Sequence, residues 1–138
     1  MLNELIINTV KSFKGLGKRK SSIANVLINS GYGLLLVNKK EASAYFASIK
    51  GCEEILKKPM LVLGLTNSIN VSIKVSGGGL NSQIEACQLG IATALSGKGQ
   101  SEKKDLENEK LLLRDLRKKE RKKYGLLKAR KAPQYSKR

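Results

Sequence analysis

The chain has 138 residues and a formal net charge of +16 at pH 7, from 27 Lys and Arg against 11 Asp and Glu, and it contains no His. This length fits one domain with a modest hydrophobic core. The absence of His removes the commonest general base and the commonest zinc ligand. The excess of positive charge predicts a polyanionic partner, either nucleic acid or an anionic membrane surface.

The sequence divides into three parts: a lead-in at 1–14, a globular body at 15–113 and a basic extension at 114–138. The lead-in is expected to remain flexible as far as Gly17 because its end is basic and rich in glycine. No secretory signal core is evident near the start. No apolar run approaches the roughly 20 residues of a membrane span. We therefore expect a reducing, aqueous compartment in which Cys52 and Cys87 are buried free thiols.

Alternating apolar residues predict strands over 22–29 and 34–37, joined by a glycine-rich turn into a hairpin. A short helix is expected over 41–47, with Asn38 as a possible cap. A second helix is expected over 49–57, ended by Pro59. A short strand is expected over 61–65.

The clearest strand signal covers 70–76, where Val71, Ile73 and Val75 alternate with polar residues. A helix fits 80–95 because its apolar residues recur three or four positions apart. A further helix is expected from Ser101 to about Leu113, with acidic residues near its start. Strands followed by helices predict an α+β body with one layer of sheet and one of helices.

Three glycines, Gly77, Gly78 and Gly79, separate that strand from the following helix. They fit a nucleotide-binding loop poorly, because Ser82-Gln83 stands where such a loop places Lys and then Ser or Thr. Two other interpretations rank above it and stay open together. The glycines permit a tight turn and close packing, or their backbone contacts RNA phosphate.

Two segments carry dense positive charge. Lys18, Arg19 and Lys20 are either a solvated strand entry or a phosphate contact. The extension at 114–138 holds 12 of the 27 basic residues and 2 of the 11 acidic ones, a net charge of +10. It is either a disordered solubilising or targeting tail or an RNA-binding segment. Its density of charge and its interleaved tyrosines, which can stack on bases, favour RNA.

Three strings resemble the S-nine family of small-subunit ribosomal proteins. They are Gly17-Lys18-Arg19-Lys20-Ser21-Ser22-Ile23-Ala24, the Gly77–Gln83 segment with Gly90-Ile91-Ala92, and Glu120 to Arg138 with its Ala132-Pro133-Gln134-Tyr135-Ser136-Lys137-Arg138 end. The resemblance implies a body related to the second domain of ribosomal protein S-five, with a left-handed βαβ crossover. It also implies a place in the head of the small subunit, beside neighbouring head proteins.

By this resemblance, the chain binds small-subunit rRNA and its tip approaches P-site tRNA. The expected rRNA contacts are Lys18, Arg19, Lys20, Gly77, Gly78, Gly79, Arg114, Arg117, Arg121, Lys122, Lys123, Tyr124, Lys128, Arg130, Lys131, Gln134 and Tyr135. The expected tRNA contacts are Ser136, Lys137 and Arg138. The family usually has Arg where Asn25 stands and basic residues near Gln88, Leu89 and Thr93. The tail is therefore expected to be the principal RNA contact.

We expect no catalytic residue, cofactor or metal. Two competing classes are a nucleotide phosphotransferase that uses the glycine turn and a free-standing binder of nucleic acid or membrane surfaces. Richness in Lys, Asn and Ile favours an AT-rich genome. The plastid stroma is the preferred compartment, and a bacterial cytoplasm or a mitochondrion is the alternative.

Overall fold

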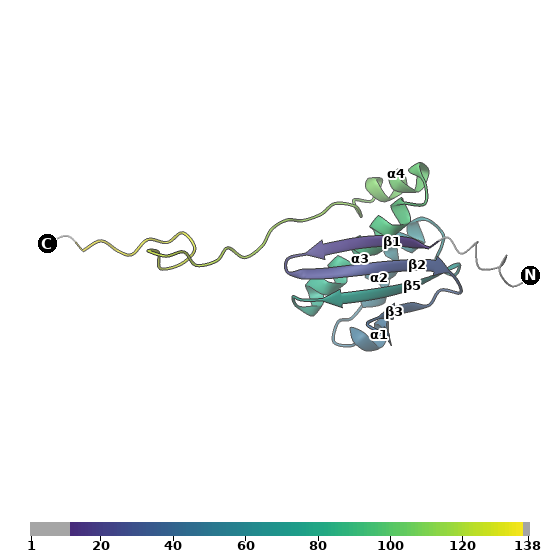
Figure 1. Cartoon of the computed structure of the whole chain (residues 1–138), viewed down its shortest axis with the longest axis horizontal. Helices are drawn as coiled ribbons and strands as arrows, with labels where there is room; N and C mark the ends of the chain where they lie inside the picture. The colour runs from purple at the N-terminus through teal and green to yellow at the C-terminus, as the bar shows by residue number, and fades with distance from the viewer. Residues whose placement is uncertain (1–11, 137–138) are drawn as a thin grey trace, which may run out of the picture.

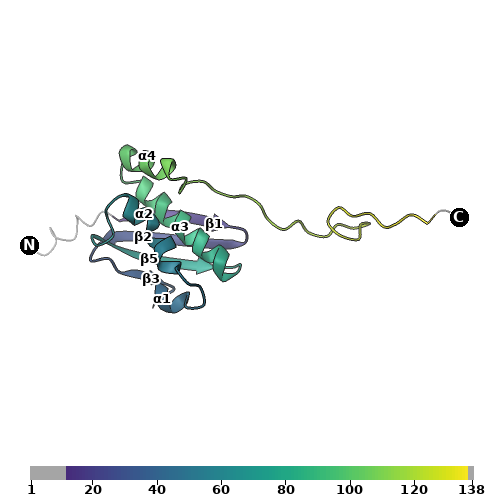
Figure 2. The ribbon, with the colours of Figure 1, turned by 180° about the vertical axis from the view of Figure 1, so that it is seen from behind.

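The computed structural model describes residues 12–136. The body is a five-stranded sheet with helices on one face and an open face opposite (Figures 1 and 2). The strands are β1 (Phe13–Arg19), β2 (Ser22–Ser30), β3 (Leu35–Val37), β4 (Lys40–Glu41) and β5 (Ile69–Ser76). The helices are α1 (Ala42–Tyr45), α2 (Cys52–Val62), α3 (Leu80–Ser96) and α4 (Gln100–Asn108). The predicted α+β class is confirmed, while lead-in residues 1–11 lie outside the described range.

The core lies between the sheet and α2 and α3. Val71, Ile73 and Val75 of β5 point into it, as the alternation predicted. Along α3, Ile84 and Ile91 are buried on the predicted face. Burial of apolar surface at these positions supplies most of the drive to fold.

The predicted hairpin between β2 and β3 is wrong. The strand order is β1-β2-β5-β3-β4, so β5 lies between them, antiparallel to β2 and parallel to β3. The Asn70 side-chain oxygen at the start of β5 accepts hydrogen bonds from the N–H groups of Tyr32 and Leu34, at 2.9 and 3.0 Å. These bonds carry the glycine-rich segment across β5 and away from β2.

A strand also forms where a flexible lead-in was expected, because β1 pairs with β2 from Phe13 onward. Its glycines are packing residues. A Cβ added to Gly15 would lie 2.2 Å from the Gly90 carbonyl oxygen, and one added to Gly17 would lie 1.8 Å from the Ala86 carbonyl oxygen. Helix α3 therefore passes so close to β1 that these two positions accept only glycine.

Several local boundaries also differ from expectation. Helix α2 continues to Val62, with the buried Pro59 inside it, and replaces the strand expected at 61–65. Asn38 does not cap α1. With φ +49, its side chain bonds the N–H and carbonyl of Val75, each at 3.0 Å, which extends the pairing of β3 with β5.

Helix α4 ends at Asn108 rather than near Leu113. Lys110 has φ +56, and the N–H of Leu111 bonds the Leu106 carbonyl at 3.0 Å. This turn buries Leu111 against the body. Within the described part of the tail, 114–136, the chain forms neither helix nor strand and extends away from the sheet (Figure 1).

Candidate nucleic-acid interface

The two short motifs singled out in the sequence lie side by side at one end of the sheet. Pairing of Arg19 with Ser22 leaves Lys20 and Ser21 as the turn between β1 and β2. Ile23 pairs with Ser76, so this turn lies next to the glycine segment that follows β5. Lys20 is exposed and has φ +51, a left-handed conformation that costs a non-glycine residue about 1 kcal/mol. The turn presents the Lys20 side chain to solvent.

The glycine turn is held by hydroxyl groups. Ser22 Oγ donates to the Gly77 carbonyl at 3.0 Å and lies 2.9 Å from Ser82 Oγ. The N–H of Gly79 donates to Ser82 Oγ at 3.1 Å. A Cβ on Gly77 would meet the Ser21 carbonyl oxygen at 2.5 Å, and one on Gly78 would meet Ser22 Oγ at 2.1 Å. These two glycines, both with positive φ, therefore permit the tight turn and close packing.

Gly79 is different, because a Cβ there would meet nothing within 4 Å. It lines a surface hollow together with Lys20, Ser21, Asn81 and Ser82. Lys20, Ser21 and Asn81 offer donors to a phosphate oxygen here, whereas Ile49 and Leu80 make part of the lining apolar and the Ser82 hydroxyl is already bonded within the turn. Gly77 and Gly78 therefore have a packing role, and the interpretation as a phosphate contact stays open for the hollow that Gly78 and Gly79 line.

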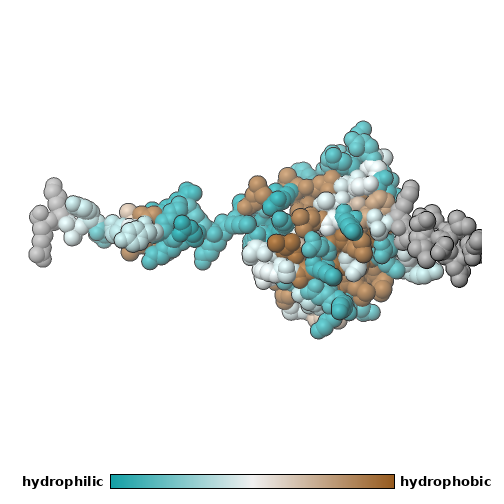
Figure 3. Space-filling model, viewed as in Figure 1, coloured by the Kyte–Doolittle hydropathy of each residue, from teal (hydrophilic) through white to brown (hydrophobic). Residues whose placement is uncertain are grey.

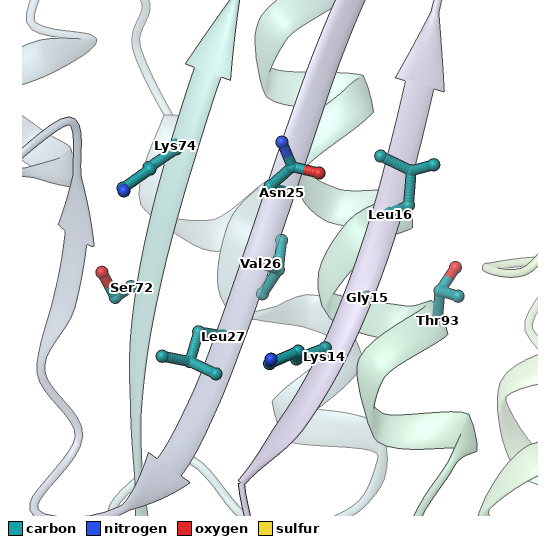
Figure 4. A pocket seen from close by; sticks show the side chains of 9 residues that line it. All are labelled: Lys14, Gly15, Leu16, Asn25, Val26, Leu27, Ser72, Lys74 and Thr93. Atoms are coloured by element: carbon teal, nitrogen blue, oxygen red, sulfur yellow. The ribbon is translucent and has the colours of Figure 1, made fainter.

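The open face of the sheet carries a second set of basic groups. Lys14 and Leu16 of β1, Asn25 and Leu27 of β2, and Ser72 and Lys74 of β5 line one shallow surface (Figure 4). The strand pairings place Leu16 beside Asn25 and Asn25 beside Lys74, which forms one row across the sheet. The outward positions of β1, β2 and β5 include no carboxylate.

Lys14 and Lys74 were not predicted as contacts. Lys14 falls in the segment expected to be flexible, so only the pairing of β1 with β2 reveals its place on the sheet. Lys74 had a usable signal, since it lies among the polar residues that alternate with the buried ones along β5. Asn25, where the family usually has Arg, lies between them on the same face.

Arg19 is placed unlike its neighbours Lys18 and Lys20. Its inward-facing side chain is only 17% exposed, and its Nε contacts the Glu85 carboxylate on α3. Its Nη1 lies 3.0 Å from Oδ2 of Asp115. Two carboxylates of the same chain therefore compensate this guanidinium, although the sequence predicts it as an RNA contact.

The tail exposes the basic side chains that the sequence analysis predicted as contacts. These are Arg114, Arg117, Arg121, Lys122, Lys123, Lys128, Arg130 and Lys131. Tyr124, Gln134, Tyr135 and Ser136 are exposed too, while Lys137 and Arg138 lie outside the described residues. In Figure 3 the tail is mostly hydrophilic, whereas the open face of the sheet mixes hydrophilic and hydrophobic residues.

One acidic residue neutralises part of the tail. Glu120 pairs with Lys123 at 2.6 Å and with Arg130 at 2.8 Å. The N–H of Leu127 bonds the Lys131 carbonyl at 2.8 Å, so the chain forms a small loop here. Glu120 therefore competes with phosphate for Lys123 and Arg130, whereas Arg121 and Lys122 form no such pair within residues 12–136.

Other chemistry finds little support in the described residues. Cys52 and Cys87 are free and buried, as predicted, and burial raises the pKa of the Cys87 thiol to about 12. Within 12–136, no three His, Cys, Asp or Glu side chains gather in a way that could hold a metal ion. No helix in that range is long and apolar enough to cross a membrane.

Comparison with known proteins decides the family. The family described as ribosomal protein S9/S16 matches residues 17–138. The chain belongs to this family. The small ribosomal subunit protein uS9 of Crocosphaera subtropica is 47% identical over 124 residues, which is 90% of each chain. Those of a Synechocystis and a Nostoc species are 47% and 46% identical over the same shares.

Membership makes the chain a structural protein of the small ribosomal subunit and not an enzyme. The suspected family is therefore confirmed, and the phosphotransferase alternative is excluded. The matched residues include the β1–β2 turn, the glycine turn and the whole tail. They exclude Lys14, which makes that residue a feature of this chain outside the family match.

Proposed function

We propose that the chain binds small-subunit rRNA in the head of the subunit, chiefly through its tail at 114–138. The observation that carries this proposal is the exposure of the predicted tail cations on a segment without helix or strand. A segment that buries no apolar face has no packing reason to hold a net charge of +10. Phosphate contact neutralises such charge and releases condensed counterions.

Two surfaces of the body support the same role. The β1–β2 turn places Lys20 beside the exposed glycine turn. The open face adds Lys14 and Lys74 among amide and hydroxyl groups, which donate hydrogen bonds to phosphate and sugar oxygens. Tyr124 and Tyr135 are fully or almost fully exposed and are available for stacking on bases.

A salt titration tests this proposal. The dissociation constant of the full chain for an rRNA fragment from the subunit head is measured from 50 to 200 mM salt. Six phosphate contacts, about half the basic residues of the tail, predict a loss of affinity of about 1,000-fold over this range. A duplex of unrelated sequence is the control. A change below about tenfold would contradict the proposal.

The last three residues have a narrower proposed role. We propose that Ser136, Lys137 and Arg138 contact the backbone of P-site tRNA, since the family match extends to residue 138. Ribosomes that lack these three residues should assemble normally but bind P-site tRNA more weakly. A variant with Lys128 and Lys131 replaced by Gln is the matched control, because it loses the same two tail charges away from the tip. Unchanged tRNA affinity in the truncated ribosomes would refute the role of the tip.

The compartment is a separate proposal. The three relatives named above come from cyanobacteria, and the richness of this chain in Lys, Asn and Ile favours an AT-rich genome. We propose a plastid ribosome. Fractionation of cells of the source organism tests this directly, and recovery of the chain in mitochondrial or bacterial ribosomes would refute it.

A further inference from the structure

The tail is tied to the body by a cluster of charged residues at its root. Asp115 lies between two arginines, Arg19 on β1 and Arg117 two residues further along the tail. Glu85 on α3 contacts the other side of the Arg19 guanidinium. Strand, helix and tail therefore meet at this cluster, next to the buried Leu111.

The body side of this cluster depends on Asp115. Nη1 of Arg19 is buried and makes no hydrogen bond in the described structure. The Asp115 carboxylate, 3.0 Å away, compensates its charge as an ion pair. Loss of Asp115 would leave Glu85 beside Nε of this guanidinium but would leave the buried Nη1 without a facing carboxylate, which is unfavourable. The ion pair with Arg19 therefore stabilises Asp115 in this position.

The tail side is a local turn closed by the same carboxylate. Oδ1 of Asp115 accepts a hydrogen bond from the backbone N–H of Arg117 at 2.8 Å. The Arg117 guanidinium adds bonds of 3.0 Å from Nε and 2.8 Å from Nη2 to Oδ2. Side-chain turns of this kind set the direction of the backbone over two residues.

These bonds also stabilise the charged carboxylate. The side-chain and backbone hydrogen bonds from Arg117, followed by the charges of Arg117 and Arg19, hold the pKa of Asp115 well below its usual range. Asp115 therefore stays ionised at every pH at which a ribosome works.

We propose that Asp115 is a positioning residue whose carboxylate, shared by Arg19 and Arg117, fixes the direction in which the basic tail leaves the body. This inference rests on the proposed binding of rRNA by the tail. If residues 113–117 are ordered before the tail contacts RNA, less conformational entropy is lost on binding. An acidic residue is thus expected to strengthen binding to a polyanion.

Two variants with the same charge separate this idea from simple electrostatics. Asp115→Asn and Glu120→Gln each remove one negative charge from the tail, but within residues 12–136 Glu120 pairs with the tail residues Lys123 and Arg130 and with no residue of the body. Electrostatics alone predicts that both bind RNA more tightly than the unchanged chain. The proposal predicts that Asp115→Asn binds the head rRNA fragment about tenfold more weakly, while Glu120→Gln binds equally or more tightly.

Backbone order gives a readout that is independent of RNA. In the free full-length chain, ¹⁵N heteronuclear NOE values for 113–117 should match those of the body. They should fall to the values of the distal tail in Asp115→Asn and remain high in Glu120→Gln. Asp115→Glu keeps the charge but moves the carboxylate by one methylene, so it should lose order as well. The amide spectrum of the body reports whether each variant is folded.

The outcomes separate this proposal from the proposed function. If residues 113–117 are as mobile in the unchanged chain as in Asp115→Asn, the positioning role is refuted, regardless of the affinities measured for RNA. If Asp115→Asn and Glu120→Gln bind RNA equally well, the role is refuted even though the tail binds RNA. If the unchanged chain shows no steep salt dependence, binding by the tail fails, while the NOE result still decides whether Asp115 orders the root.

Discussion

The closeness of β1 and α3 makes Gly17→Ala the sharpest test of the fold. The added Cβ would lie 1.8 Å from the Ala86 carbonyl oxygen and 2.5 Å from the Gly90 nitrogen. Both are backbone atoms of α3, so no side chain can rotate away. An ordinary contact requires strand and helix to separate by roughly 1.5 Å, which a close-packed interior resists. We expect the free energy of unfolding to fall by about 3 kcal/mol, the upper end of the range for overpacked cores.

Urea unfolding followed by circular dichroism measures this loss, which corresponds to a fall of about 12 °C or more in the melting temperature of a body of this size. Gly97→Ala is the matched control. Gly97 has φ −72, and the nearest atom to its added Cβ is 3.4 Å away. This control should change stability by less than about 0.5 kcal/mol or raise it slightly. A loss below about 1 kcal/mol in Gly17→Ala would refute the close approach of α3 to β1.

Three further predictions follow from named contacts. Lys20→Gly should raise the free energy of unfolding by about 1 kcal/mol, because it relieves a left-handed conformation. The same change should weaken RNA binding, because it removes a charge. A stabilised chain with unchanged affinity for RNA would show that Lys20 does not contact RNA. Joint replacement of Lys14 and Lys74 by Gln should make the plot of the logarithm of the RNA-binding constant against the logarithm of salt concentration less steep, by about 2 relative to joint replacement of Lys39 and Lys40 by Gln. Equal slopes would exclude the open face as an RNA contact. The raised pKa of Cys87, about 12 against 9.0 in an unfolded chain, predicts that its stabilising effect is complete below pH 9 and declines above it, because only the unfolded thiol ionises. Its reaction with a thiol reagent at pH 8 should therefore require denaturant, and rapid labelling of the native chain would contradict the burial.

The elements predicted correctly are those with a local signal. The alternation along β5 and the helical spacing along α3 each place a buried face within one segment. Strand partners are different, because the insertion of β5 between β2 and β3 depends on contacts distant in the sequence. Gly15 and Gly17 lie in a segment that reads as a linker. The pairing of β1 with β2 shows that they belong to a strand, and the close passage of α3 shows why they are glycine.

The residues of the candidate interface also divide into those that a local sequence signal identifies and those that depend on the fold. Charge density identified the tail, since that property needs no fold to be recognised. The pairing of Arg19 with Asp115 joins the start of the body to the start of the tail, and no periodicity in either segment predicts it. The same limit applies to Lys14, whose place on the open face depends on the register of β1 with β2.

Sedimentation of small subunits through sucrose gradients of rising salt tests the central claim most directly, that the tail is the principal attachment to RNA. The full chain and a chain ending at Leu113 are each incorporated into subunits, and circular dichroism first shows that the shortened chain is folded. The full chain should remain with the subunits into high salt, and the shortened chain should be released at much lower salt. Release of both chains at the same salt concentration would contradict the claim.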